Sequence, residues 1–182
     1  MMPATLTIFL ANYLLFVDGL AAVIVIAGLL YRRARFLAFR WAVAAGVIGI
    51  LCFVFVQIGG LLYYDPRPFV VGHFQPLISH AADNGFPSDH ALLAAALIAL
   101  VALIDIPLAL PFTLLAIVID WARVGVGVHH DVDIVGSSVF VALATLIALL
   151  LRPLIVRWLA PRLPTWASGW RTPRETDEHR RA

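Results

Sequence analysis

The sequence DHALLAAALIALVALIDIPLALPFTLLAIVIDWARVGVGVHHDVD occupies residues 89–133. It contains two apolar runs separated at Asp105-Ile106-Pro107, because proline interrupts helical hydrogen bonding and disfavours the helical conformation at the residue before it. Each run approaches the roughly 20 apolar residues that a helix needs to cross a bilayer. The pattern predicts two membrane helices, residues 89–104 and 110–128, whose polar far ends lie on one side of the membrane.

Three further apolar runs, residues 6–31, 41–64 and 132–151, extend this pattern over most of the 182-residue chain, and the first is interrupted by Asp18. Hydrophobic residues make up 62% of the sequence, against about 45–50% in soluble domains. This excess is typical of a protein whose surface faces lipid. We therefore expect an all-α fold, a polytopic membrane helix bundle with about five transmembrane helices in residues 1–160.

The orientation of the bundle follows from its arginines, which account for all 13 basic residues. They are concentrated between the first two runs and after the last one, and such clusters stay in the cytoplasm. Five helices separate an outside N-terminus from an inside C-terminus, which agrees with both clusters. We expect an inner (plasma) membrane protein with residues 161–182 as a mobile cytoplasmic tail. Arginines placed in this way do not form the basic face of a nucleic-acid-binding protein, so no such partner is expected.

Three polar clusters lie at the predicted outer ends of the helices. The first polar cluster is Arg67-Pro68, in which arginine offers a planar fork of donors that suits phosphate oxygens. The alternative is an arginine that extends to lipid headgroups. The second polar cluster is Pro87-Ser88-Asp89-His90, where Ser88 is placed to cap a helix whose free amides attract anions. His90 can donate a proton near neutral pH, whereas the alternative is a capped helix without catalytic function.

The third polar cluster consists of Arg123, His129 and Asp133. His129 and Asp133 are four residues apart, a spacing that lets them hydrogen-bond on one helix face. A carboxylate on one ring nitrogen leaves the other nitrogen free as a nucleophile. The alternative is a metal site formed by His129, His130, Asp131 and Asp133, because imidazole and carboxylate groups are common metal ligands. The neighbouring arginines argue against it, since they already supply positive charge.

Together the three clusters resemble the motifs of the integral-membrane type 2 phosphatidic acid phosphatase superfamily. Arg67-Pro68 matches the end of the first motif, Pro87-Ser88-Asp89-His90 matches the second with Asp89 in place of glycine, and Arg123, His129 and Asp133 match the third at the right spacing. Two positions depart from the family pattern, because Gly60 stands where the motif has lysine and Ala122 stands where it has serine. The sequence from Ser79 to His90 looks like the undecaprenyl-diphosphatase branch associated with bacitracin resistance.

The resemblance implies a metal-independent hydrolase that removes the terminal phosphate of a polyprenyl (undecaprenyl) diphosphate at the extracytoplasmic face. It implies catalytic roles for His129 as nucleophile, His90 as proton donor and Asp133 as the group that orients His129. It implies phosphate binding by Arg67, Ser88, Asp89 and Arg123, with no metal or other cofactor. The expected partners are the polyprenyl diphosphate and membrane lipids, and the expected process is recycling of the lipid carrier of peptidoglycan biosynthesis.

Two other functions remain open at this stage. The same chemistry can act on another lipid phosphate, such as phosphatidylglycerophosphate or phosphatidate. A transporter or lipid-binding protein would use the same charges to hold an anion without cleaving it. Two carboxylates inside the predicted spans also need an explanation, since buried charges in a membrane are costly. Asp120 is placed to pair with Arg123 one helical turn later, whereas the sequence suggests no partner for Asp18. Among the loop histidines, His80 is placed to approach the headgroup.

Overall fold

The computed structural model describes residues 3–162, and within this range the fold is helical without any strand. Five long helices are joined by four connections, of which three are short; the one between the second and third long helices, residues 63–88, is long and contains a single-turn helix. In chain order the elements are α1 (Ala4–Tyr31), α2 (Arg35–Leu62), α3 (Pro68–Val71), α4 (Asp89–Ala102), α5 (Ile106–Gly125), α6 (Asp131–Leu159) and a final 3-10 turn (Ala160–Arg162).

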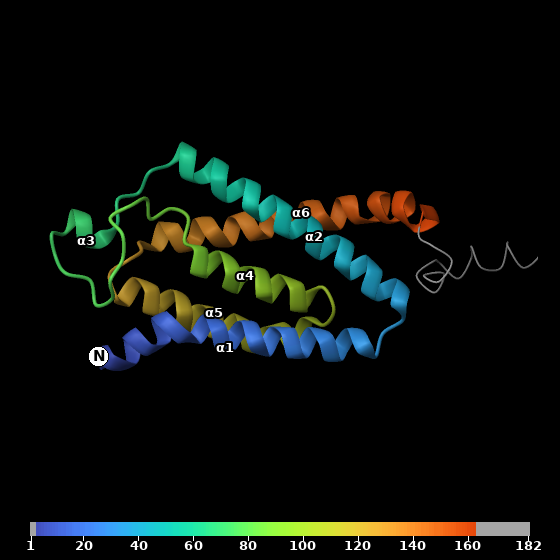
Figure 1. Cartoon of the computed structure of the whole chain (residues 1–182), viewed down its shortest axis with the longest axis horizontal. Helices are drawn as coiled ribbons and strands as arrows, with labels where there is room; N and C mark the ends of the chain where they lie inside the picture. Colours follow the sequence, from blue (N-terminus) through green and yellow to red (C-terminus); the bar gives the residue numbers. More distant parts are fainter. Residues whose placement is uncertain (1–2, 163–182) are drawn as a thin grey trace, which may run out of the picture.

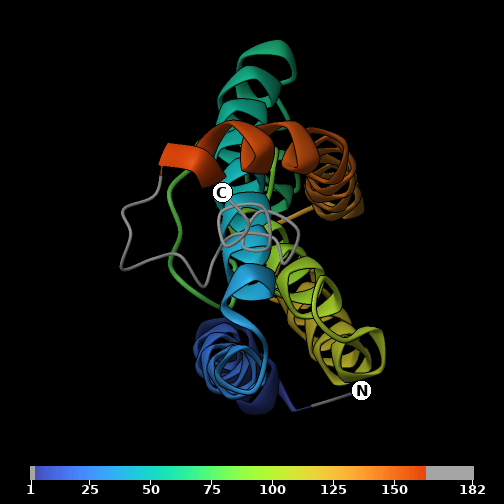
Figure 2. The same cartoon turned by 90° about the vertical axis from the view of Figure 1, so that its right-hand side faces the viewer.

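The five long helices run along the long axis of the molecule and alternate in direction (Figure 1). α1, α4 and α5 pack against one another, and α2 packs against α6. α4 also contacts α6 and so joins the two groups. Figure 2 shows these helices from one end of the bundle. Many of the most buried residues are alanines, which let helix backbones approach closely in a membrane; they include Ala11, Ala22, Ala44, Ala91, Ala94, Ala116, Ala122, Ala144 and Ala148.

The outer surface of the bundle is apolar over most of its length. Large side chains such as Phe16, Leu61 and Leu150 are 73%, 87% and 66% exposed. Such exposure would be unfavourable in water, but it suits contact with lipid chains. Four of the helices, α1, α2, α5 and the segment Asp131–Arg162, are long and apolar enough to cross a membrane. The predicted all-α membrane bundle is confirmed.

Several predicted boundaries were wrong: the largest difference is at the end of α6, and α4 is two residues shorter than predicted. This helix has 14 residues, or a length of about 21 Å at 1.5 Å per residue, which is shorter than the ~30 Å hydrocarbon core. It ends at Ala102 because the chain turns there to begin α5 at Ile106, where Pro107 is tolerated in the first helical turn. α6 continues to Leu159 instead of ending near residue 151. The expected tail lies outside the described residues, apart from Pro161 and Arg162.

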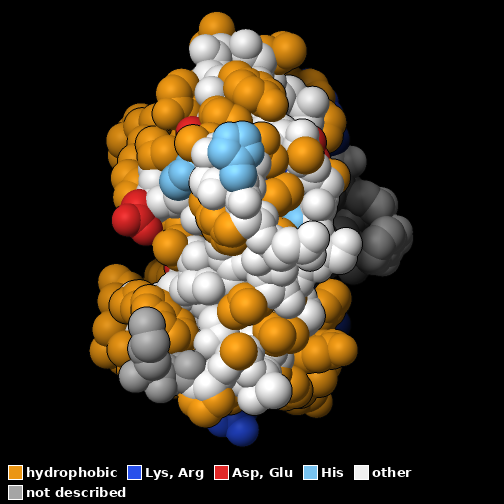
Figure 3. Space-filling view, turned by 90° about the vertical axis from the view of Figure 1, so that its left-hand side faces the viewer, with side chains coloured by type: hydrophobic (Ala, Val, Ile, Leu, Met, Phe, Trp, Pro, Cys, Tyr) orange, Lys and Arg blue, Asp and Glu red, His pale blue; other side chains and the backbone are white. Residues whose placement is uncertain are grey.

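All three polar clusters lie at one end of the bundle, where α2 and α5 end and α4 and α6 begin. Figure 3 views the molecule from this end, where histidine side chains and polar loop atoms appear between apolar flanks. The connection from α5 to α6 turns at Gly127, which has a φ of +81°. A Cβ at this position would lie 2.7 Å from the ring of Phe74, so the tight turn requires glycine. The turn brings His129 back toward Arg123.

Candidate active site

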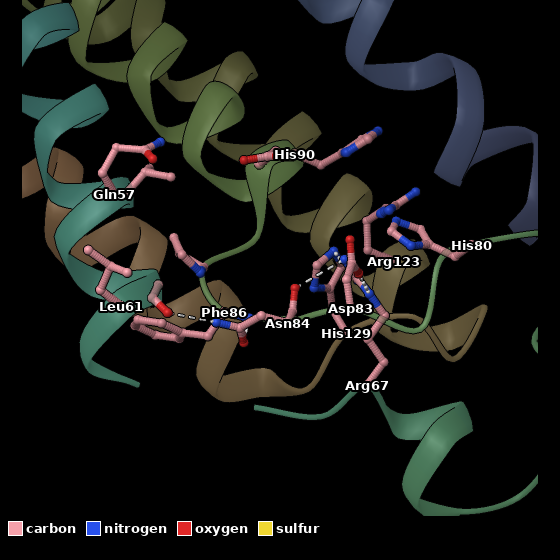
Figure 4. A pocket seen from close by; sticks show the side chains of 14 residues that line it. Gln57, Leu61, Arg67, His80, Asp83, Asn84, Phe86, His90, Arg123 and His129 are labelled. Carbon is pink, nitrogen blue, oxygen red and sulfur yellow. Dashed lines mark hydrogen bonds and ion pairs between the residues drawn. The ribbon is translucent and has the colours of Figure 1, made fainter. Parts of the chain in front are cut away.

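A cavity of about 600 Å³ opens at this end of the bundle and collects residues from all three polar clusters. Arg67 reaches it from the start of α3, Asp89 and His90 from the first turn of α4, Arg123 from the end of α5, and His129 from the turn before α6 (Figure 4). The rest of the lining consists of Val56, Gln57, Gly60, Leu61, His80, Asp83, Asn84, Phe86 and Pro87. Segments far apart in sequence thus form a single polar cavity at the end of an apolar bundle.

His129 is held in one orientation by Asp133. The imidazole Nδ1 lies 3.1 Å from Asp133 Oδ2, and the same oxygen accepts a hydrogen bond from the backbone N–H of His130 at 2.9 Å. His129 is 3% exposed and Asp133 is fully buried. Because the carboxylate occupies Nδ1, the proton rests on that nitrogen and the Nε2 lone pair remains available. This nitrogen lies on the side of the ring that faces Arg67.

Arg67 is also fixed by several contacts. Its Nε donates to Asp83 at 2.6 Å, and its Nη1 donates to the carbonyl oxygen of Val128 at 2.9 Å. The same Nη1 lies 3.5 Å from Nε2 of His129, which places a positive charge directly beside the candidate nucleophile. Arg67 is 5% exposed. An anion that reaches His129 therefore also meets this guanidinium group.

Arg123 is a second buried cation, 4% exposed, and its Nε has no hydrogen-bond partner among residues 3–162. The predicted pairing with Asp120 was wrong, because the described residues contain no ion pair between them and Asp120 Oδ1 is also without a partner. The reason is that the side chain of Arg123 lines the cavity and does not pair with a residue of its own helix. Its donors are therefore available to an anion. Asp18 is fully buried, and neither of its carboxylate oxygens has a hydrogen-bond partner in the described part of the chain.

The residues of the second polar cluster have two different positions at the start of α4. Asp89 and His90 line it. Ser88 is fully buried and does not, and its hydroxyl accepts a hydrogen bond from the amide of Ala91 as the helix cap. The carbonyl of Ser88 accepts from Ser137 Oγ at 2.9 Å, which fastens the start of α4 to α6. Ser88 thus positions the helix end, while its phosphate-binding role stays a prediction.

Asn84 and Asp83 are two site residues that the sequence analysis missed. The amide oxygen of Asn84 accepts from the backbone N–H groups of Asp65 and Phe86, and its nitrogen donates to the carbonyl oxygens of Gly60 and Tyr63. All of its hydrogen-bonding capacity is used to fasten the loop before α4 to the end of α2. Both residues lie within six positions of the second polar cluster, and this proximity was the only feature of the sequence that could have identified them.

The electrostatics of the loop reflect the arginine beside it. Burial raises the pKa of Asp83, but the hydrogen bond and charge of Arg67 outweigh this effect and lower the pKa below its ordinary value of 3.8. Burial lowers the pKa of His80 below 6.5, and the charge of Arg67 lowers it further. The ring of His80 lies 6.2 Å from that of His129. A neutral imidazole therefore lies beside the candidate nucleophile, and the expected approach of His80 to the headgroup stays a prediction.

A group of possible metal ligands lies behind the cavity, and it differs from the predicted set. Asp65, His130 and Asp133 have ligand atoms within 4.8 Å of one another. His129 and Asp131, which the metal alternative also required, are not members of this group. His130 Nδ1 already lies 2.7 Å from Asp65 Oδ2, and Asp133 already accepts two hydrogen bonds. These hydrogen bonds by themselves stabilise the start of α6.

The fold and site define a polytopic membrane protein with a buried, cation-rich cavity suited to a phosphorylated ligand. Residues 41–158 match the model of the PAP2 superfamily, and the chain belongs to this family. It is 37% identical over 95 residues to the undecaprenyl-diphosphatase BcrC of Bacillus subtilis, an alignment that covers 52% of this chain and about half (49%) of that protein. It is 32% identical over 164 residues to the putative undecaprenyl-diphosphatase YbjG of Escherichia coli, covering 89% of this chain and 80% of that protein.

A third relative is the bacitracin transport permease protein BcrC of Bacillus licheniformis, 29% identical over 157 residues that cover 85% of this chain and 70% of that protein. No solved structure matches the chain. The predicted superfamily and its undecaprenyl-diphosphatase branch are confirmed, and so is the enzyme class, a hydrolase of the phosphatase type.

Proposed function

We propose that this protein hydrolyses the terminal phosphate of a polyprenyl diphosphate at the extracytoplasmic face of the membrane, through a phosphohistidine intermediate. The observation that carries the proposal is the arrangement around His129. Its Nδ1 is held by Asp133, while its Nε2 lies in the cavity beside the guanidinium group of Arg67. A nucleophile with a fixed tautomer and a neighbouring cation suits attack on a phosphate group.

In the first step, the Nε2 lone pair of His129 attacks the terminal phosphorus, and the bond from phosphorus to the bridging oxygen breaks. His90 lines the same cavity and donates a proton to that oxygen as the polyprenyl monophosphate leaves. The negative charge of a bound diphosphate favours the protonated form of His90. Asp133 stabilises the positive charge that develops on the His129 ring as the phosphorus–nitrogen bond forms.

Arg67 and Arg123 stabilise the transition state, in which charge spreads over the equatorial oxygens of the transferred group. Both guanidinium groups are almost completely buried, and a buried charge acts more strongly on its neighbours than an exposed one. In the second step a water molecule loses a proton to His90 and attacks the phosphohistidine. Phosphate leaves, and His129 and His90 return to their initial states. The two arginines supply the charge stabilisation that a metal ion supplies in other phosphatases, so the proposed reaction is metal-independent.

An apolar groove next to the site supports the proposal of a polyprenyl substrate. A cavity of about 380 Å³ between α2 and α4 shares Val56, Gln57 and Asp89 with the lining of the polar cavity. Its other lining residues are apolar or small: Ala45, Ile48, Gly49, Cys52, Phe53, Leu92, Leu93, Ala96 and Leu100. A lipid whose phosphates lie at His129 can extend its chain along this groove. Two relatives bear the name undecaprenyl-diphosphatase, which agrees with such a substrate.

The distribution of arginines supports the proposal that the active site lies on the extracytoplasmic side of the membrane. Arg32, Arg33, Arg35 and Arg40 surround the connection from α1 to α2, at the end of the bundle opposite the cavity (Figure 1). Arginine clusters of this kind mark the cytoplasmic side. The cavity, and with it the reaction, is then extracytoplasmic, while the C-terminus is cytoplasmic.

The test is phosphate release from undecaprenyl diphosphate by purified protein in the presence of a chelator, with His129→Ala as the inactive variant. We expect turnover by the wild type that EDTA leaves unchanged, and none by the variant. Phosphatidylglycerophosphate and phosphatidate are assayed in parallel. Faster turnover of either glycerolipid would refute the polyprenyl substrate, and loss of activity with EDTA would refute the metal-free mechanism. Binding of substrate without turnover would favour the transporter alternative.

A further inference from the structure

A second cavity, of about 210 Å³, lies at the opposite end of the bundle. It is formed where the α1–α2 connection, the end of α4 and α6 meet. Arg33, Arg40 and Arg152 contribute three cationic side chains from two separate parts of the sequence, and Trp41 belongs to the same lining. The remaining lining is apolar and consists of Leu30, Leu37, Leu103 and Ile104.

The positive charge of this cavity is not balanced by nearby carboxylates. None of its lining residues is acidic, and the described part of the chain contains no ion pair that involves Arg33, Arg40 or Arg152. The nearest acidic residue in sequence is Asp105, whose Oδ1 accepts the amide of Leu108 as the cap of α5. The Nε of Arg152 is buried and has no hydrogen-bond partner within residues 3–162. Like charges brought together in this way repel one another unless an anion lies between them.

The surrounding contacts hold the cavity in shape without using these donors. Trp41 Nε1 donates to the carbonyl oxygen of Leu100 at 3.0 Å, which fastens the start of α2 to the end of α4. The guanidinium of Arg40 lies 5.8 Å from the ring centroid of Phe36, a contact that does not use its N–H groups as hydrogen-bond donors to an oxygen. Donors from three arginines therefore converge on one hollow.

We propose that this cavity binds the phosphate headgroup of an anionic glycerophospholipid. Arginine matches phosphate oxygens through paired N–H donors, and basic residues next to membrane helices attract acidic lipids. The site lies at helix ends, the depth at which headgroups occur, and its apolar rim of Leu30, Leu37, Leu103 and Ile104 suits the first carbons of the acyl chains. A soluble anion would have no use for that rim. The bound lipid would connect the α1–α2 connection to α6. The proposal does not depend on the reaction at the other end.

The test is lipid binding to the purified full-length protein in neutral detergent, followed by native mass spectrometry and by the unfolding temperature. Phosphatidylglycerol is titrated, with phosphatidylcholine as the zwitterionic control and inorganic phosphate as the soluble anion. Arg152→Gln is compared with Arg157→Gln, which removes an exposed arginine of the same helix that does not line the cavity. If Arg152→Gln fails to fold, Arg40→Gln replaces it.

We expect phosphatidylglycerol to bind and to raise the unfolding temperature of the wild type. Arg152→Gln should weaken this binding roughly tenfold, the effect of one charge-assisted hydrogen bond, while Arg157→Gln should leave it unchanged. Phosphatase activity in neutral detergent should be the same in both variants. Equal weakening of lipid binding by both substitutions would show that the binding depends on general surface charge, and it would overturn the proposal. So would equal binding of phosphatidylcholine, or equal stabilisation by inorganic phosphate alone.

Discussion

Replacement of Asp133 by asparagine should reduce catalysis without unfolding the site. Asparagine keeps the size of the side chain and one oxygen that can accept from His129 Nδ1 and from the backbone N–H of His130, now at 3.1 and 2.9 Å. It removes the negative charge that stabilises the ring as the phosphorus–nitrogen bond forms. A hydrogen bond to a charged group contributes about 1.5–3 kcal/mol. The loss corresponds to a decrease in kcat of about 10- to 150-fold.

The assay is steady-state phosphate release from undecaprenyl diphosphate, with kcat and KM determined separately. KM should change little, because Asp133 acts on the nucleophile and does not line the cavity. Asp131→Asn is the matched control, since Asp131 is an exposed carboxylate in the same first turn of α6. A kcat within threefold of the wild type for Asp133→Asn would refute the orienting role. So would an equal loss in both variants.

Three further predictions concern the surroundings of the site. Gly60→Lys should restore the cation of the family motif and lower KM about tenfold, the effect of one added charged contact to phosphate. The position accepts a Cβ, because the nearest atom to it would be 3.6 Å away. An unchanged KM would show that the position does not reach the phosphate. Gly136→Ala should cost about 1–3 kcal/mol and lower the unfolding temperature, since its Cβ would lie 2.1 Å from the ring of Phe86, whereas Gly49→Ala, with nothing within 4 Å, should not. The lowered pKa of Asp83 means that its ion pair contributes to stability above about pH 4 and that this contribution is lost as the pH falls through the folded-state pKa. The wild type should therefore be more stable than Asp83→Asn at pH 7, and this difference should shrink as the pH falls below about 4. A difference that stays constant as the pH is lowered would contradict this assignment.

The helices of the fold were predictable because lipid imposes a simple length and composition on each span. The approximate positions of α1, α2, α5 and α6 followed from this rule alone. α4 was predicted too long because its apolar sequence continues through residues 103 and 104, while the turn into α5 already begins after Ala102. Turn geometry depends on contacts such as that of Trp41 with the carbonyl of Leu100, which link residues 59 positions apart.

The gathering of the polar clusters was also predictable, because alternating helices return to the same side of a membrane. Ser88 caps α4, as its place in the sequence predicted, and its phosphate-binding role stays a prediction. What the sequence did not predict is how the loop before α4 is held, because the side chain of Asn84 fastens it to the end of α2 through residues far away in the sequence. Arg123 was expected to pair with Asp120 because they share a helix. The resemblance had also named Arg123 as a phosphate-binding residue; its position in the lining of the cavity is consistent with that role, which stays a prediction.

Everything proposed for the reaction rests on a covalent bond between phosphorus and His129. The measurement that tests it is brief incubation with undecaprenyl diphosphate labelled with ³²P in the terminal phosphate, an alkaline quench that preserves phosphohistidine, and peptide mass spectrometry. We predict label on the peptide that contains His129, and none on His129→Ala protein. Label on a different residue, or turnover by His129→Ala at the wild-type rate, would contradict the mechanism.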